Sequence, residues 1–175
     1  MDYFYSSSGN EGVVIIIQAR TGSKRFPNKI LAKVNGKKLI DYSIDAAIIS
    51  GISFVVAIPE HDTKLIDYLE FRRIPHYCGS ELDVLDRFYC CAANYHAETI
   101  IRLCGDTLYT IDDITQQMKL YKERKKFTYG NGVFIFSFKE LEYAWKNATG
   151  SHREHVTTYL YNCIDYPEDL ERLPL

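Results

Sequence analysis

The sequence predicts a single-domain α/β protein with a mostly parallel central sheet flanked by helices. Apolar runs of strand length alternate with longer amphipathic stretches, a pattern typical of βαβ units. The 175 residues, of which 46% are hydrophobic and 25% charged, suit one ordinary globular domain, and no internal repeat or linker divides them. The net charge of -2 argues against a basic nucleic-acid binder, so no nucleic-acid partner is expected.

The chain lacks an apolar segment of membrane-spanning length. Its longest aliphatic run, Val13 to Ile17, ends at Gln18, far short of about 20 residues, so we expect a cytoplasmic protein without a membrane partner. Residues 1–12 have no signal-peptide pattern, and we expect a mobile lead-in there and one domain over 13–175. The five cysteines form an odd set without C-x-x-C spacing, which favours buried small side chains over disulfides or zinc.

The first half of the chain shows the clearest alternation. VVIIIQ predicts a buried first strand, and KLIDYSIDAAIIS predicts the helix after it. SFVVAIP and DTKLIDYLEFRR predict the second strand and helix. The next cycle is a helix, DVLDRFYCCAANYHA, followed by a strand, ETIIRLCGD, whose apolar residues end at Gly105 and Asp106. This third predicted strand carries a carboxylate at its C-terminal end.

The second half continues with shorter elements. DDITQQMKLYKERKK predicts a helix that begins at Asp112 or Asp113 and ends in a basic turn, as the helix dipole favours. GVFIFSF predicts a strand and KELEYAWKNA a helix. SHREHVTTYLY predicts a short helix capped by Ser151, and CIDYPEDLERL a strand end before a last helical turn opened by Pro167.

A basic loop, QARTGSKRFPNK, follows the first predicted strand directly. Gly22 lets backbone N–H groups approach an anion, and Ser23 adds a hydroxyl donor. Arg20, Arg25 and Lys29 supply charged groups that suit phosphate, in the usual phosphate-binding position of an open α/β sheet. The loop matches neither G-x-x-x-x-G-K-[ST] nor G-x-G-x-x-G. Charge and glycine content alone therefore leave two interpretations open, a triphosphate site and a solvated basic turn.

Five sequence blocks, in order, resemble the SpsF-like cytidylyltransferases of spore coat polysaccharide synthesis, which are related to the CMP-sialate and CMP-KDO synthetases. IIIQARTGSKRFPNKIL resembles their Q-A-R-x-G-S-x-R-x-P-x-K, and CGSELDVLDRFY their G-S-x-x-D-V-L-x-R-[FY]. IIRLCGDTLYTID, SHREHVTTYL and CIDYPEDLERL are similar to the R-x-x-G-D-x-P-x-I-D, R-E-H-V-T and [IV]-D-x-P-E-D-L segments. The resemblance implies a Rossmann-like nucleotidyltransferase fold of the GT-A-like type.

The resemblance also implies an activity, the Mg²⁺-dependent transfer of CMP from CTP to a sugar acid or related surface-glycan precursor with release of pyrophosphate. Such chemistry depends on positioning and charge neutralisation. Arg20, Lys29 and Asp106 are the expected catalytic residues. Asp106 and Asp165 match the Mg²⁺ positions, although a turn at Asp106 and a helix cap at Asp165 are structural alternatives. The residues expected to bind the triphosphate are Arg20, Gly22, Ser23, Arg25 and Lys29.

A second group of residues resembles the family's base and ribose pocket. It comprises Gly79, Ser80, Asp83 and Arg87. A capping box, with the serine starting the helix, is a compatible alternative for Ser80 and Asp83. Arg102, in the third predicted strand, would reach the nucleotide, or would pair with a surface carboxylate for little energy.

The histidines near the C-terminus do not indicate a metal site. His152 and His155 do not form the H-E-x-x-H motif, so zinc is not expected. The resemblance places His155 near the acceptor, while an ordinary exposed histidine is the alternative.

The sequence departs from the family pattern on the acceptor side. The segment 130–137, GNGVFIFS, lacks both acids of G-x-D-V-E-x-F-S, the proline expected near Leu108 is absent, and the connection before CIDYPEDL is short. These departures allow an unusual acceptor, a nucleotide-binding protein with little or no transfer activity, or a site completed by a second copy in a homodimer. A nucleotide preference other than CTP also stays open.

Overall fold

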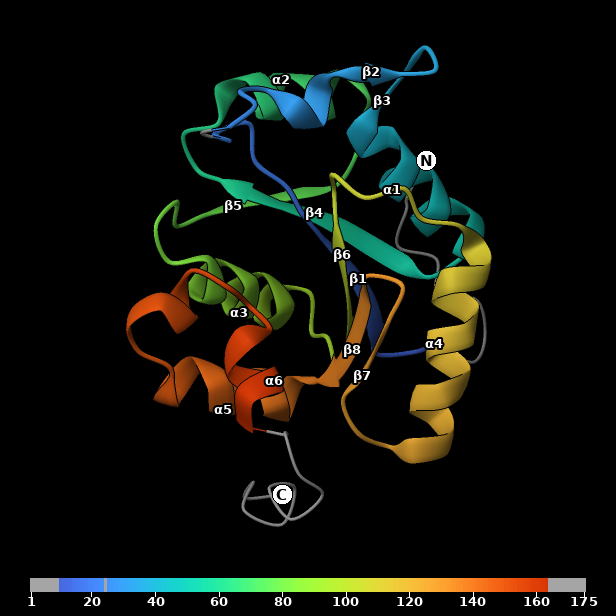
Figure 1. Cartoon of the computed structure of the whole chain (residues 1–175), viewed down its shortest axis with the longest axis vertical. Coiled ribbons are helices and arrows are strands. Elements are labelled where there is room, and N and C mark those ends of the chain that lie inside the picture. The colour runs from blue at the N-terminus through green and yellow to red at the C-terminus, as the bar shows by residue number, and fades with distance from the viewer. Residues whose placement is uncertain (1–9, 24, 164–175) are drawn as a thin grey trace.

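The computed structural model describes residues 10–23 and 25–163, and a six-stranded sheet lies at the centre of this part (Figure 1). The strand order is β5-β4-β1-β6-β8-β7. β1, β4, β5 and β6 run parallel, whereas β8 is antiparallel to β6 and to β7. The predicted, mostly parallel sheet is therefore confirmed. The strands are β1 (Val13–Gln18), β4 (Ser53–Pro59), β5 (His76–Gly79), β6 (Thr99–Cys104), β7 (Thr128–Gly130) and β8 (Val133–Ser137).

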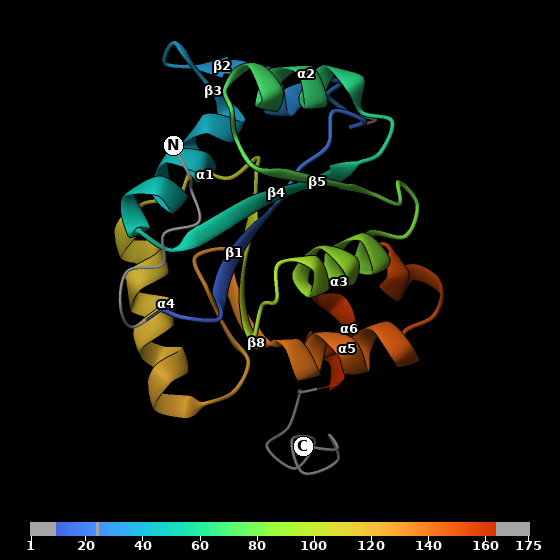
Figure 2. The same cartoon turned by 180° about the vertical axis from the view of Figure 1, so that it is seen from behind.

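Helices cover both faces of this sheet (Figures 1 and 2). One face packs against α1 (Leu39–Ser50), α2 (Thr63–Phe71) and α4 (Ile111–Arg124). The other packs against α3 (Val84–Asn94), α5 (Phe138–Asn147) and α6 (Thr158–Cys163). None of the helices described has both the length and the apolar character to cross a membrane. The remaining elements of the described part are β2 (Lys33–Val34), β3 (Lys37–Lys38) and the 3-10 helices η1 (Lys29–Leu31) and η2 (Gly150–Arg153).

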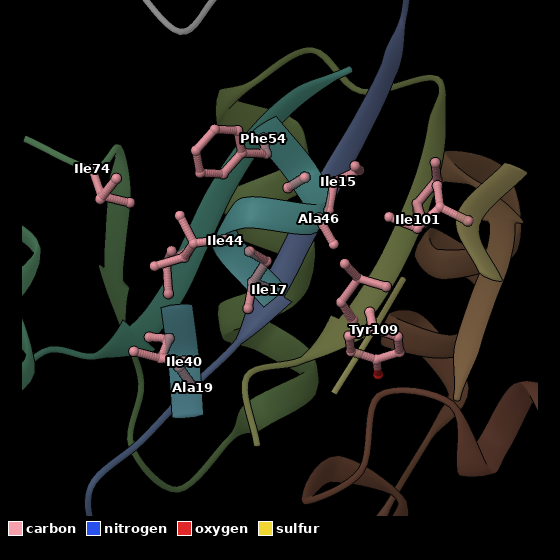
Figure 3. Close-up of a cluster of buried hydrophobic side chains, with 14 of the residues drawn as sticks. Ile15, Ile17, Ala19, Ile40, Ile44, Ala46, Phe54, Ile74, Ile101 and Tyr109 are labelled. Atoms are coloured by element: carbon pink, nitrogen blue, oxygen red, sulfur yellow. The ribbon is translucent and has the colours of Figure 1, made fainter. Parts of the chain in front are cut away.

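The apolar run of β1 contributes to two hydrophobic cores. Successive side chains of a strand point to opposite faces, so Ile15 and Ile17 pack toward α1, where Figure 3 shows them near Ile44. Val14 and Ile16 pack toward α3 and α5. All of these side chains are buried. A strand covered on both faces explains why the run is continuous rather than alternating.

Most predicted elements are confirmed to within one or two residues. The helix expected from Asp112 or Asp113 begins at Ile111, because Thr110 is its N-cap and forms a capping box with Asp113.

Two segments differ from the prediction. The strand over 99–104 was expected as the third strand of the sheet in chain order, but it is the fourth, because β5 precedes it. β5 is short and only half buried, so its apolar pattern in the sequence is weak. The expected helix over 151–161 is instead η2 followed by α6, and Ser151 lies inside η2 rather than capping a helix. The predicted strand end and turn at 164–173 lie outside the described residues.

The order of the strands determines where a site can form. From β1 the chain crosses to β4 and β5 on one side, and it later returns to β6 on the other side. The carboxyl ends of β1 and β6 are therefore neighbours, with Gln18 paired to Cys104. In sheets of this type, a ligand crevice opens at the point where the strand order reverses.

Candidate active site

A cavity of about 600 Å³ opens at the carboxyl ends of β1 and β6. Its wall consists of the loop after β1 and the turn after β6. The cavity thus brings together five side chains expected to act on phosphate or Mg²⁺, those of Arg20, Ser23, Arg25, Lys29 and Asp106. The other residues of the wall are Gln18, Ala19, Phe26, Ile30 and Cys104.

The loop after β1 is held in place by Asp62, a residue that the sequence motifs did not indicate. The carboxylate of Asp62 accepts hydrogen bonds from the Thr21 backbone N–H at 2.6 Å and from the Thr21 hydroxyl at 2.8 Å. It also caps α2 by accepting from the Leu65 N–H. The signal available in the sequence was an Asp-Thr pair at a helix start. The N-cap of one helix thereby fixes the loop that presents the basic side chains.

The charges at the cavity are mostly positive. Lys29 Nζ lies 3.0 Å from Asp106 Oδ2, with the two side chains 42% and 47% exposed, so this pair adds little to stability. Within the described part of the chain, neither Arg20 nor Arg25 takes part in an ion pair. Among the described residues, three cationic groups and one carboxylate line the cavity, and this excess of positive charge favours binding of an anion.

The turn that carries Asp106 is held by two further residues that the motifs did not indicate. The Ser43 hydroxyl lies within hydrogen-bond distance of the Cys104 and Thr107 carbonyls, at 3.1 and 3.2 Å. The Tyr109 hydroxyl accepts from the Cys104 N–H at 3.0 Å and donates to a carbonyl of the β7–β8 turn at 3.0 Å. Burial raises the pKa of Tyr109, so its hydroxyl keeps the proton that it donates.

Arg87 is buried and does not line the cavity. The side chain is 1% exposed, and its Nη1 donates to the Ser80 carbonyl at 2.5 Å. Its Nε and Nη2 find no hydrogen-bond partner among the residues described. Burial, and secondly the charge of Arg20, lower the pKa of Arg87. A Cβ at Gly79 would lie 2.9 Å from Arg87 Cγ, so a glycine there makes room for the buried arginine.

Asp83 is the N-cap of α3, the place that the capping-box alternative gave to Ser80. Its Oδ1 accepts from the Asp86 N–H at 2.9 Å, and its own N–H donates to Ser80 Oγ at 3.0 Å. Its Oδ2 accepts from Arg153 Nε and Nη2 at 2.8 and 2.5 Å. The capping-box alternative, in which Ser80 starts the helix and Asp83 lies in its first turn, is therefore wrong, because the helix begins at Val84.

Arg102 does not line the cavity but contacts a residue that does. Its Nε and Nη2 donate to Gln18 Oε1 at 3.2 and 2.9 Å, and Gln18 lines the cavity. Its guanidinium stacks on the ring of Phe134 at 4.9 Å. Phe134 stands where the family pattern has an acid, so the arginine packs on an aromatic ring. The surface ion pair considered for Arg102 is not found among the described residues.

Three other expected positions lie outside the main cavity. Gly22 lines a smaller cavity of about 140 Å³, which shares Arg20 with the larger one. His155 is exposed in the segment before α6. Asp165 lies outside the described residues, so its role as a second Mg²⁺ position stays a prediction.

The residues at the cavity suit a cation that shares its coordination with a ligand. Asp106 offers one carboxylate, and no group of three or more His, Cys, Asp or Glu side chains that could hold a metal occurs in residues 10–23 and 25–163. Mg²⁺ is commonly held by one or two carboxylates together with water and phosphate oxygens. The site therefore fits Mg²⁺ bound along with a phosphate group, rather than an all-protein metal centre.

Known proteins resemble this chain in sequence and in fold. A family model described as "Cytidylyltransferase" matches residues 14–164. The spore coat polysaccharide biosynthesis protein SpsF of Bacillus subtilis is 31% identical, over 86% of this chain and 70% of that protein. The pseudaminic acid cytidylyltransferase of Campylobacter jejuni strain 81-176 is 29% identical, over 76% and 60%. A cytidylyltransferase structure from Leptospira borgpetersenii superposes with a TM-score of 0.78 at 23% identity, over 93% of this chain and 73% of that one, and so shares the fold.

Proposed function

Since the chain belongs to the cytidylyltransferase family, we propose that it transfers CMP from CTP to a sugar acid or related surface-glycan precursor and releases pyrophosphate. The observation that carries this proposal is that three cationic side chains and one carboxylate of the described residues line a single cavity at the carboxyl ends of β1 and β6. The acceptor class is supported by two relatives, one named for polysaccharide biosynthesis and one for pseudaminic acid.

The basic side chains of the cavity are proposed to hold the triphosphate. The guanidinium groups of Arg20 and Arg25 can each make two parallel hydrogen bonds to phosphate oxygens, whereas the Lys29 ammonium acts as a point charge. Ser23 Oγ accepts from the Phe26 N–H at 3.3 Å, which leaves the hydroxyl proton free to point at a phosphate. These contacts neutralise the negative charge that grows on the departing pyrophosphate.

The proposed reaction is a displacement at the α-phosphorus of CTP. An acceptor oxygen forms a bond to that phosphorus and loses its proton to solvent. The bond from the α-phosphorus to the oxygen that bridges it to the β-phosphorus breaks, and this oxygen leaves with pyrophosphate. Asp106 would hold Mg²⁺, which when bound supplies further neutralisation of phosphate charge.

The loop from Gly79 to Asp83 is proposed to contact the cytidine. Glu81 of this loop and Arg20 line the same smaller cavity, which brings the loop beside the phosphate-binding residues. Asp83 and Arg87 make their hydrogen bonds within the protein. In this proposal they hold the loop, while the loop backbone and the Ser80 hydroxyl reach the nucleotide.

The test is a pyrophosphate-release assay with CTP, Mg²⁺ and a panel of acceptors that includes sialic-type acids, KDO and pseudaminic acid. We expect release that requires both CTP and one of the acids, with the CMP product identified by mass spectrometry. Reactions with UTP, ATP or GTP are the controls for nucleotide choice.

A second candidate function is nucleotide binding with little or no transfer. It is favoured by one observation, the presence of Gly132 and Phe134 where the family pattern has acids. Measurable CTP binding without pyrophosphate release from any acceptor would support it. Tighter binding of UTP than of CTP, read as a larger thermal shift, would instead point to another nucleotide specificity.

A further inference from the structure

Arg153 in η2 connects the C-terminal part of the described chain to the start of α3. Its Nε and Nη2 donate to Asp83 Oδ2 at 2.8 and 2.5 Å, and its Nη1 donates to the Trp145 carbonyl at 2.5 Å. The side chains of Arg153 and Asp83 are only 25% and 33% exposed. All three nitrogens of this guanidinium are thus used inside the protein, and water screens the pair only in part.

Asp83 connects Arg153 to the 79–83 loop beside the cavities. Its Oδ1 caps α3, and its N–H donates to Ser80 Oγ. The first turn of α3 is tied to the same region, since Trp145 Nε1 donates to Asp86 Oδ1 at 2.8 Å. Without Arg153, Asp83 Oδ2 would lose its charged partner, and the carboxylate would be free to turn away from the helix end. The Ser80–Asp83 turn would then be held less firmly.

We propose that Arg153 is a positioning residue for the nucleotide, which sets the affinity for CTP by fixing the Ser80–Asp83 turn next to Arg20. The inference rests on the proposed function. It gives the R-E-H-V-T block a role on the nucleotide side of the site, whereas the resemblance placed the neighbouring His155 near the acceptor.

The chain offers a matched control for this proposal in the Arg72–Asp41 ion pair. Arg72 Nη1 lies 3.0 Å from Asp41 Oδ1, with side-chain exposures of 35% and 9%. This pair is also an arginine and an aspartate, is also partly buried, and joins α2 to α1 rather than touching the cavities. A substitution at Arg72 therefore reports what the loss of a comparable ion pair does to the fold alone.

The experiment compares Arg153→Gln, Arg153→Lys and Arg72→Gln in the full chain, with CTP affinity measured by calorimetry and stability by the melting temperature. We expect Arg153→Gln to raise the Kd for CTP about tenfold. Arg153→Lys should raise it about threefold, because lysine keeps the charge but loses the fixed fork of donors. Arg72→Gln should lower the melting temperature by at least as much as Arg153→Gln and leave the Kd unchanged.

The outcomes separate this inference from the proposed function. If the unsubstituted chain binds CTP and the Kd of Arg153→Gln is no higher than that of Arg72→Gln, Arg153 is merely structural and the inference is overturned. If the unsubstituted chain does not bind CTP, the proposed function falls and the inference falls with it. Should Arg153→Gln fail to fold, Arg153→Lys decides, because a folded lysine variant with an unchanged Kd also overturns the inference.

Discussion

Two groups of charged side chains in this fold differ in where their charge is neutralised. Between α1 and α2, the Tyr68 hydroxyl lies 2.7 and 2.8 Å from the two carboxylate oxygens of Asp41, and Arg72 Nη1 lies 3.0 Å from one of them. Every charge there has a protein partner. At the cavity, by contrast, Arg20 and Arg25 have no ion-pair partner among the described residues.

Charges that are paired within the protein serve the fold, whereas charges without an ion-pair partner are available to a ligand. The first group stabilises the packing of two helices. In the second group, the charge of Arg20 is unfavourable for the fold, since it helps to lower the pKa of the buried Arg87. Active-site residues commonly reduce stability in this way. Substitutions in the second group should therefore lower ligand affinity without lowering stability, whereas substitutions in the first group should lower stability without changing ligand affinity.

The largest effect is expected from Asp106→Asn, which removes the one carboxylate that lines the main cavity in the described part of the chain. If Asp106 holds Mg²⁺, turnover should fall by about a hundredfold or more, and the dependence of the rate on Mg²⁺ concentration should weaken. Pyrophosphate release measured across a Mg²⁺ titration tests this. Asp112→Asn, the same change at an acid in the first turn of α4, is the control and should leave turnover unchanged. Full activity of Asp106→Asn would show that the metal assignment is wrong.

A smaller loss of affinity, without loss of stability, is expected from Arg20→Ala. Loss of a charged hydrogen bond to phosphate costs about 1.5 to 3 kcal/mol, so the Kd for CTP should rise by about ten- to a hundredfold. The melting temperature should stay the same or rise, because Arg87 is relieved of a like charge. Calorimetry and thermal denaturation measure the two quantities. A marked fall in melting temperature would contradict the distinction between the two groups.

The sequence was sufficient to predict the parts of this fold that depend on local pattern. The run Val13–Ile17 predicted a buried first strand, and the charge order of the α4 segment predicted its helix. β5 was missed because four residues with half-exposed side chains give no clear alternation. The antiparallel direction of β8 was not predictable, since an apolar run is the same in either direction.

The candidate site was predictable only where its residues follow a strand directly. The basic residues after β1 lie close to Asp106 after β6, because β1 and β6 are parallel neighbours whose carboxyl ends lie side by side. Arg87 was expected beside the nucleotide but not as a buried side chain, because arginines are rarely buried completely. The contact of Asp83 with Arg153 joins residues 70 positions apart, and a local sequence pattern cannot predict a contact between residues so far apart in the chain.

A loss of stability without loss of affinity is expected from Asp41→Asn. The substitution removes the charge that Tyr68 and Arg72 share, and it should lower the free energy of unfolding by about 1 to 3 kcal/mol. Urea denaturation measures this change. The Kd for CTP should stay as in the unsubstituted chain, because Asp41 does not line either cavity. An unchanged urea midpoint would mean that the α1–α2 charges do not stabilise the fold.

The smallest effect is a change in stability at alkaline pH that depends on Tyr68. Burial, and then the neighbouring Asp41 carboxylate, raise the pKa of Tyr68 from 10.0 to about 12. Above pH 10 the unfolded chain loses this proton first, so the stability that Tyr68 contributes is present below pH 10 and is lost as the pH rises through about 12. Tyr68→Phe removes this titration while it keeps the ring under Lys38 Nζ, which lies 3.5 Å from its centroid. Urea midpoints between pH 9 and 11.5 should therefore fall more steeply for the unsubstituted chain than for the variant, and equal slopes would show that Tyr68 ionises as easily in the folded protein as in the unfolded chain.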